Sequence, residues 1–132
     1  MGPSPAHPYR VFLSHSSRDS WLALTIADRM KQLGVSVWID AMSLTGGQDV
    51  LRGIREAIQT ADETVVVVSP QSLRSQWVSV EIGMAEVLGK RITPLLNHVD
   101  PSEFAPLASR KAYELNDVEK FLVELKERVA RA

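Results

Sequence analysis

The sequence predicts an α/β fold in which five parallel strands form one sheet with helices on both faces. Short apolar runs alternate with stretches of helical periodicity from residue 9 to the end of the chain. The run at 65–68 is four consecutive valines, which is typical of a central strand buried on both faces. Strands connected by crossover helices form parallel sheets covered on both sides.

The first strand and the first helix are expected within residues 9–34. Residues 9–14 surround the apolar run Val11-Phe12-Leu13, which suits a short buried strand. Apolar residues then recur at helical spacing up to Leu33. Asp19 or Ser20 is expected to cap this helix, and Gly34 is expected to end it.

The middle of the chain contains the next two strands. Residues 35–39 are rich in β-branched and aromatic side chains, which favour a strand. Residues 40–48 are interpreted as a loop, and the apolar stripe over 50–61 predicts the second helix. After the valine strand at 65–68, Ser69-Pro70 can start a short helical turn, since proline is favoured at the first helical position.

The last part of the chain follows the same alternation. A third helix is expected from about Gln76 to Leu88, closed by Gly89. Residues 92–96 predict a fourth strand, broken or placed at an edge by Pro94. Residues 111–115 are interpreted as a weak edge strand.

The final helix is expected after an irregular segment at 100–110. Asn116 with Glu119 forms an N-cap pair, and apolar positions from 118 to 129 give the buried stripe. Five strands in a chain of this length favour the flavodoxin-like strand order 2-1-3-4-5.

Composition limits the classes of function. The 132 residues fit one domain at 9–132, after a proline-rich lead-in at 1–8 that is expected to be disordered. The absence of cysteine excludes disulfides, thiolate metal sites and a thiol nucleophile. A formal net charge of -1 gives no electrostatic signal for nucleic acid or a membrane surface. The apolar runs are too short to span a bilayer and the N-terminus lacks signal-peptide features, so a cytoplasmic protein is expected.

Ligand-binding residues are expected where the central strands end. In open parallel sheets, ligands bind at the carboxyl ends of the strands near the switch point in strand order. This rule selects three loops, which begin at Ser14, Asp40 and Ser69. The histidines, His7, His15 and His98, are scattered and lack the spacing of metal ligands.

From the residues alone, each loop has a plain structural interpretation beside a functional one. The serines that follow Ser14 can hold phosphate at a helix N-terminus, or simply cap and turn the chain. Leu44 is an apolar residue on the second loop, which suits a contact surface. Single exposed apolar residues are, however, common on protein surfaces. Trp77 and Glu81 share one helix face, so they are either a catalytic pair or a core tryptophan beside a surface glutamate.

Taken together, these segments resemble those of the Toll/interleukin-1 receptor (TIR) domain family, in its bacterial or archaeal form. The resemblance extends over about residues 9–131 and depends on five motifs occurring in the family's order. The motifs are Tyr9–Asp19, Val37–Asp40, Leu44 followed by Gly46-Gly47, Ile54-x-x-Ala57-Ile58, and Val67–Pro70 followed by Ser72, Ser75 and Trp77-x-x-x-Glu81.

The resemblance implies the same five-stranded fold and an enzymatic activity. Many TIR domains cleave NAD+ into nicotinamide and ADP-ribose or a cyclic isomer, and their catalytic residue matches Glu81. NAD+ is then the substrate, and no cofactor or metal is required. The substrate-binding positions implied are the following: Ser14, His15, Ser16, Trp38, Asp40, Gly46 and Trp77.

The resemblance also implies assembly. Family members often self-associate through the loop at 40–48, where Leu44 and Gly47 are the expected contact residues, and a sensor domain or partner chain supplies the trigger. Bacterial immune defence or interference with host signalling is the implied setting. A non-catalytic TIR interaction module is the alternative, and a related enzyme that cleaves N-glycosidic bonds of nucleosides is a third hypothesis. Met42 stands where some NAD+-cleaving members have an acidic residue.

Overall fold

The computed structural model describes residues 8–41, 47–74, 76–100 and 111–132. The strands in these ranges are β1 (Arg10–His15), β2 (Ser36–Ala41), β3 (Glu63–Val68), β4 (Arg91–Leu96) and β5 (Tyr113–Glu114). The α-helices are α1 (Ser20–Lys31), α2 (Gly47–Thr60), α3 (Gln76–Val87) and α4 (Val118–Arg131). Within the part of the chain that is described, no helix has the length and apolar character needed to cross a membrane.

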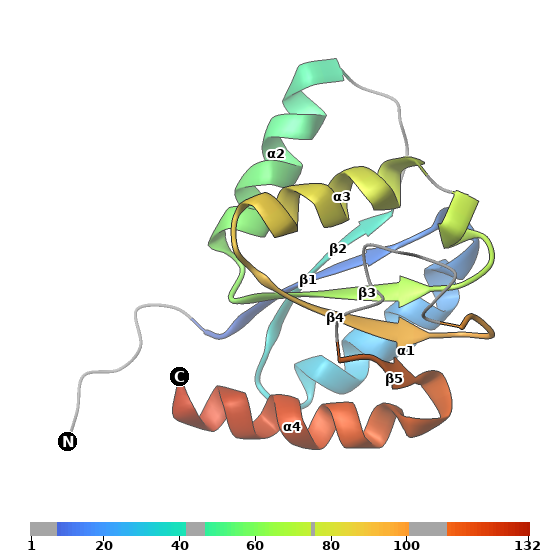
Figure 1. The fold of residues 1–132 in the computed structure, drawn as a ribbon. Coiled ribbons are helices and arrows are strands. Elements are labelled where there is room, and N and C mark those ends of the chain that lie inside the picture. Colours follow the sequence, from blue (N-terminus) through green and yellow to red (C-terminus); the bar gives the residue numbers. More distant parts are fainter. Residues whose placement is uncertain (1–7, 42–46, 75, 101–110) are drawn as a thin grey trace.

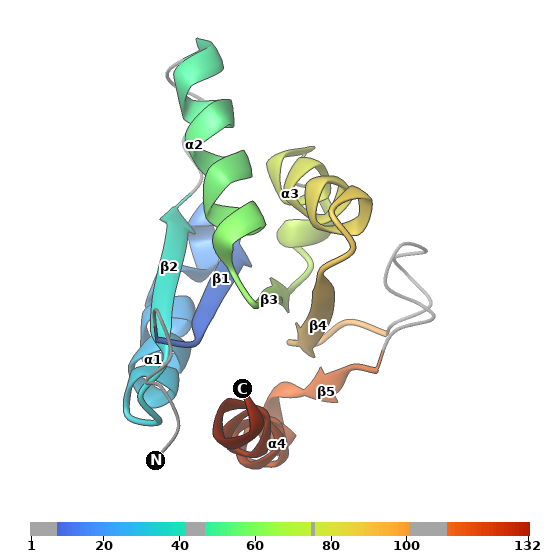
Figure 2. The same cartoon turned by 90° about the vertical axis from the view of Figure 1, so that its left-hand side faces the viewer.

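The strands form a single parallel sheet in the order β2-β1-β3-β4-β5. The predicted fold class and strand order are therefore confirmed. Figures 1 and 2 show α2 and α3 on one face of the sheet and α1 and α4 on the other. The expected lead-in at 1–8 and the irregular segment at 100–110 fall, except for Pro8 and Asp100, outside the described residues.

Two hydrophobic cores lie on the two faces of the sheet, and strand alternation decides which side chain enters which core. In β1, Val11 and Leu13 pack with α1 and α4, whereas Phe12 packs with α2 and α3. In β3, every residue is buried, as the unbroken valine run predicts. A core on each face explains why the central strands have no polar alternation.

The glycines predicted to end two helices are confirmed, whereas the side-chain caps predicted to begin two helices are not. Gly34 and Gly89 follow α1 and α3 with positive φ values of 84° and 68°, which is the left-handed conformation that glycine adopts without strain. The predicted side-chain caps are wrong. Asp19 precedes α1 but caps nothing, because its carboxylate accepts hydrogen bonds from two serines instead. A 3₁₀ turn at Leu115–Asp117 leads into α4 and replaces the expected cap from Asn116 and Glu119.

Two predicted strand ends and one helix start are also wrong. β1 continues through His15, and β2 continues through Asp40 and Ala41, so the sequence placed the loops too early. α2 begins at Gly47, which shortens the expected 40–48 loop from the other side. The two strands extend further because they pair with each other as far as His15 and Ala41.

The end of the sheet differs from expectation as well. β4 continues through Pro94 without interruption, whereas the sequence predicted a strand broken or at an edge. The missing N–H of Pro94 is tolerated because β5 pairs only with Leu95 and Leu96. The short helical turn expected to start at Ser69-Pro70 is a 3₁₀ helix that begins two residues after Pro70, at Ser72.

A buried carboxylate fixes the amino end of β3 to the last helix. Glu63 has no exposed surface. Arg128 on α4 donates from Nε to its Oε2 at 2.8 Å and from an Nη nitrogen to its Oε1 at 2.9 Å, and the Tyr9 hydroxyl donates to Oε2 at 2.5 Å. These hydrogen bonds compensate the loss of hydration.

The Glu63 carboxylate also shifts the titration of its two partners. Its hydrogen bond is the main cause that raises the pKa of Arg128 above its ordinary value. Burial raises the pKa of Tyr9, and the hydrogen bond and negative charge of Glu63 raise it further. Both partners are therefore held in their protonated forms.

Replacing Arg128 with methionine should destabilise the fold. The substitution keeps the aliphatic stem but leaves Glu63 as a buried carboxylate without its guanidinium partner, which costs about 3 kcal/mol of unfolding free energy. Urea denaturation of the parent and the Arg128→Met variant measures the difference. Arg131→Met is the matched control on the same helix, because Arg131 is exposed and lies 3.9 Å from Glu127. A loss in Arg128→Met no larger than in Arg131→Met would contradict this role.

The stability of the parent should fall more steeply above pH 10 than that of a Tyr9→Phe variant. The unfolded chain ionises Tyr9 near pH 10, whereas the folded chain, in which the pKa of Tyr9 is raised, keeps it protonated. The unfolded state then binds fewer protons, so this contribution is present below about pH 10 and is lost as the pH rises further. Urea denaturation at pH 7, 9 and 10.5 gives the two slopes. Parallel slopes would contradict the raised pKa.

Candidate active site

The carboxyl edge of the sheet holds a buried carboxylate in contact with β1, an inner strand. Glu81 lies on α3, and the Ser14 hydroxyl on β1 donates to its Oε1 at 2.8 Å. Both side chains are fully buried, at 0% exposure. The sequence placed Ser14 and Glu81 in the same site, and the structure brings them into direct hydrogen-bond contact.

The surroundings of Glu81 on α3 are apolar. Val78, Ile82 and Ala85, which lie three, one and four residues away, are buried in the core shared with α2. Burying a carboxylate among such residues is unfavourable, and an apolar side chain would suit packing better. A carboxylate retained in such a position is typical of a functional group.

Strand β2 contributes an aromatic surface on the same face of the sheet. Trp38 is paired in register with Phe12, and their rings stack with centroids 5.0 Å apart and an interplanar angle of 17°. Phe12 is fully buried, whereas Trp38 is 43% exposed, so one aromatic ring remains accessible. Ser14 follows Phe12 by two residues, which places its side chain on the face that carries Glu81, and its backbone pairs in register with that of Asp40.

His15 and Ser16, which the sequence placed with Ser14, make contacts elsewhere. Strand alternation directs His15 to the opposite face from Ser14. His15 is buried, and its Nδ1 lies 2.6 Å from the carbonyl oxygen of Ser16, so that nitrogen carries the proton and donates. Their predicted roles in binding substrate stay predictions.

A hydroxyl and carboxylate cluster connects the ends of β1 and β3. Asp19 Oδ2 accepts a hydrogen bond from Ser16 at 2.8 Å and one from Ser69 at 2.5 Å. Ser72 donates from its hydroxyl to the Ser69 carbonyl at 2.9 Å and accepts from the Ser69 N–H at 2.7 Å. These contacts hold the two strand ends together beside the Ser14–Glu81 pair.

Several predicted site residues fall outside the described part of the chain. Leu44 and Gly46 are among the residues that are not described, as are the side chains of Asp40 and Trp77. By their backbones, Gly47 begins α2 and Trp77 lies in the first turn of α3. Among the described residues, no group of three or more histidine, aspartate or glutamate side chains has the arrangement of a metal site.

Two contacts that support the candidate site were not predicted from the sequence. Phe12 supports Trp38, and the only signal for this contact is that each occupies the third position of its strand. Asp19 connects Ser16 to Ser69 over a separation of 50 residues. Its position before a helix favoured a capping role, and no sequence pattern points to Ser69, the residue that follows β3.

The arrangement provides one carboxylate, one hydroxyl that orients it, and one accessible aromatic ring. A fixed carboxylate in a site without bulk water stabilises a developing positive charge strongly. An exposed indole offers a stacking surface for a planar ring. The fold and this site together define a parallel α/β domain with a carboxylate-centred site at the carboxyl edge of its sheet.

Comparison with known proteins identifies the family. A family model described as "TIR domain" matches residues 11–126. The chain therefore belongs to the TIR domain family. A solved TIR domain from the Toll-related receptor TRR-2 of Hydra magnipapillata has a TM-score of 0.68 at 19% identity, covering 92% of this chain and 98% of that one.

Curated relatives include enzymes. The chain is 28% identical over 124 residues to a probable 2′ cyclic ADP-D-ribose synthase from Brachypodium distachyon, covering 90% of this chain and 55% of the relative. It is 28% identical over 117 residues to a 2′ cyclic ADP-D-ribose synthase from Bacteroides thetaiotaomicron, covering 83% of this chain and 41% of the relative. The chain thus spans about half the length of the curated relatives it matches.

Proposed function

We propose that this TIR domain cleaves the bond between nicotinamide and ribose in NAD+, with Glu81 as the catalytic residue. The observation that carries the proposal is the fully buried Glu81 carboxylate, hydrogen-bonded by Ser14 at 2.8 Å at the ligand-binding edge of the sheet. The names of the two cyclic ADP-D-ribose synthases add support.

The chemistry requires little from the protein. The nicotinamide nitrogen of NAD+ carries a positive charge, so when the C–N bond breaks its electron pair leaves with a neutral nicotinamide and no general acid is needed. The ribose becomes a cation in the transition state, and the Glu81 carboxylate stabilises it by charge. Water then adds to the ribose carbon and loses a proton, giving ADP-ribose; addition of a hydroxyl of the same molecule instead gives a cyclic isomer.

The neighbouring residues have positioning and binding roles in this proposal. Ser14 holds one carboxylate oxygen of Glu81 and so orients the other. The exposed ring of Trp38 stacks on a planar part of the nucleotide. No cofactor or metal takes part, and NAD+ is the substrate.

The same proposal includes control by self-association. Because Glu81 has no exposed surface, NAD+ reaches the carboxylate only after the groups that cover it move. Contact with a second copy through the 40–48 segment, with Leu44 at the interface, supplies that rearrangement, and a sensor domain or partner chain promotes it. A cytoplasmic role in bacterial immune defence or in interference with host signalling fits such control.

Glu81→Gln should reduce nicotinamide release by about 100-fold or more. The substitution keeps the size and the contact with Ser14 but removes the negative charge that stabilises the ribose cation. Nicotinamide formed from NAD+ is measured by chromatography at high protein concentration. Glu86→Gln is the matched control, because Glu86 is an exposed residue of the same helix, and it should keep the parent rate.

Circular dichroism of both variants separates loss of chemistry from loss of folding. Equal activity in Glu81→Gln and the parent would overturn the assigned role. A parent that assembles but releases no nicotinamide would favour a non-catalytic interaction module. Cleavage of free nucleosides without cleavage of NAD+ would favour the nucleoside-processing alternative.

The rate of NAD+ cleavage should rise more than tenfold when the protein concentration is raised tenfold. Self-association is second order in protein, so the fraction of active copies grows with concentration. Adding folded Glu81→Gln protein to a fixed low concentration of the parent should also raise the rate, because the inactive copies still provide the interface. An unrelated inert protein at the same mass concentration controls for crowding. A rate strictly proportional to parent concentration, unchanged by the variant, contradicts activation by assembly.

A further inference from the structure

A cavity of about 430 Å³ lies between β4, β5 and α4. β4 is six residues long, whereas β5 pairs with it only at Leu95 and Leu96. Along Arg91–Pro94, no described strand pairs with β4 on that side, and the space there forms the cavity. We refer to it as the basic cavity, after Arg91, Lys111 and Arg128 in its lining.

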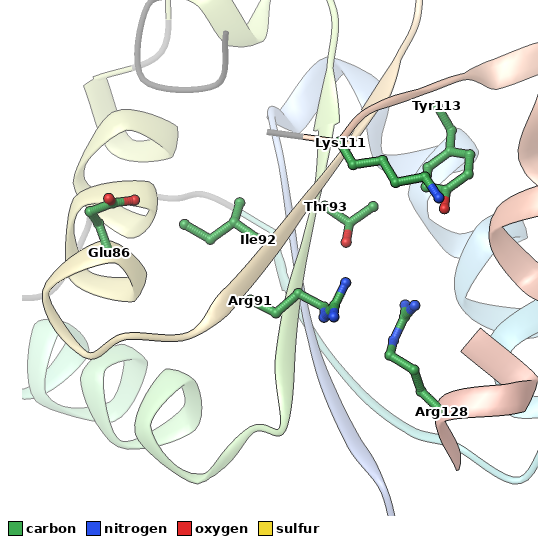
Figure 3. Close-up of a pocket in the computed structure, with 7 residues that line it drawn as sticks. All are labelled: Glu86, Arg91, Ile92, Thr93, Lys111, Tyr113 and Arg128. Atoms are coloured by element: carbon green, nitrogen blue, oxygen red, sulfur yellow. The ribbon is translucent and has the colours of Figure 1, made fainter. Parts of the chain in front are cut away.

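The side chains of the basic cavity converge on one space. Figure 3 shows the guanidinium groups of Arg91 and Arg128, the Thr93 hydroxyl and the polar ends of Lys111 and Tyr113 turned toward one another. Arg91 and Glu63 are paired in register, so both side chains lie on the face that α4 covers. Thr93 is only 4% exposed, whereas Arg91 and Lys111 are exposed, so the cavity combines a buried hydroxyl with basic side chains that solvent can reach.

The basic cavity contains more hydrogen-bond donors than acceptors. The Glu63 carboxylate accepts three hydrogen bonds, two from Arg128 and one from Tyr9, and none of them comes from Arg91. Among the described residues, Arg91 forms no ion pair, and the hydroxyls of Thr93 and Tyr113 form no hydrogen bond.

The other two basic residues keep donors to spare. Arg128 uses two of the five guanidinium N–H groups on Glu63, and Lys111 uses one of three ammonium N–H groups on Glu124. The remaining acidic residue of the lining, Glu86, comes from α3 and lies beyond Ile92, away from this group of donors in Figure 3.

We propose that the basic cavity binds the phosphate group of a small molecule. A phosphate offers three or four oxygens to donors that approach from different directions, and paired guanidinium groups recognise it through two parallel hydrogen bonds each. A carboxylate has only two oxygens and leaves part of this donor set unused. The volume lies in the range of small-molecule sites.

The phosphate site is separate from the proposed catalytic site. Arg91 is the first residue of β4 and lies at the amino end of the sheet, whereas Ser14 lies near the carboxyl end of β1. Arg128 belongs to both the cavity and the Glu63 contact, so a bound phosphate adds a second anion to the group that fixes α4 to β3. Ligand binding there stabilises the folded state by mass action.

The test is a titration of the ¹⁵N-labelled chain, followed by NMR, with chloride used to hold ionic strength constant. Orthophosphate and ribose 5-phosphate should each give saturable shifts at the Thr93 and Tyr113 amides and at the Nε resonances of Arg91 and Arg128. Acetate should bind at least about tenfold more weakly, because it engages fewer charge-assisted hydrogen bonds. Saturable shifts with ribose 5-phosphate alone would show that the cavity requires an organic phosphate. Saturable shifts with both ligands would show that the phosphate group is sufficient for binding.

Variants locate the binding and separate it from catalysis. Arg91→Ala should weaken phosphate binding by about tenfold or more, since it removes one charged partner without breaking an ion pair. Arg52→Ala, which removes an exposed arginine from α2, should leave binding unchanged. Glu81→Gln should also bind phosphate like the parent, whether or not the chain cleaves NAD+. Non-saturable shifts, equal affinity for acetate and phosphate, or unchanged affinity in Arg91→Ala would overturn the proposal.

Discussion

Alternation of side chains along β1 is the constraint on which the rest of the structure depends. β1 lies between β2 and β3, so its side chains can point only to one core or the other. Val11 and Leu13 enter the core with α1 and α4, and Phe12 enters the core with α2 and α3. The same parity brings Ser14 to α3, where it meets Glu81. A shift of one residue in this strand would exchange the two cores and remove the site at once.

The two fully buried carboxylates, Glu63 and Glu81, have different hydrogen-bond partners. Glu63 is matched by a guanidinium with two hydrogen bonds and by a phenol, which is the pattern of a structural anchor. Glu81 is contacted by the neutral hydroxyl of Ser14 and is flanked on its helix by apolar core residues. Packing and stability account for the first carboxylate. For the second, we propose a role in chemistry on a cationic sugar.

The sequence predicted what depends on local pattern. The valine run and the alternation of strand and helix led to the correct sheet order, and Gly34 and Gly89 end their helices as expected. The side-chain cap predicted at Asp19 does not form, because its carboxylate accepts a hydrogen bond from Ser69, which lies 50 residues away in the sequence. The contact of Glu63 with Arg128 crosses 65 residues and has no periodic signal. For the site, the strand-end rule selected the loop that begins at Ser14, and the resemblance to TIR domains singled out Glu81. Neither showed that His15, the next residue, faces the other way.

The two ends of the sheet have different roles: the amino end holds a structural contact, and the carboxyl end holds the candidate active site. At the amino end, Glu63 and Arg128 fix α4 to β3, and Arg91 and Arg128 leave donors facing the basic cavity. At the carboxyl end, Ser14, Trp38 and Glu81 form the candidate active site. β3 and β4 run the whole distance between the two ends and are paired over six residues. Glu81 has no exposed surface, so a substrate can reach its carboxylate only after the groups that cover it move. The six-residue pairing of β3 with β4 makes the helices and loops at the carboxyl edge, rather than these strands, the expected place of that movement. An anchored amino end is therefore compatible with the proposed opening of the candidate active site on assembly.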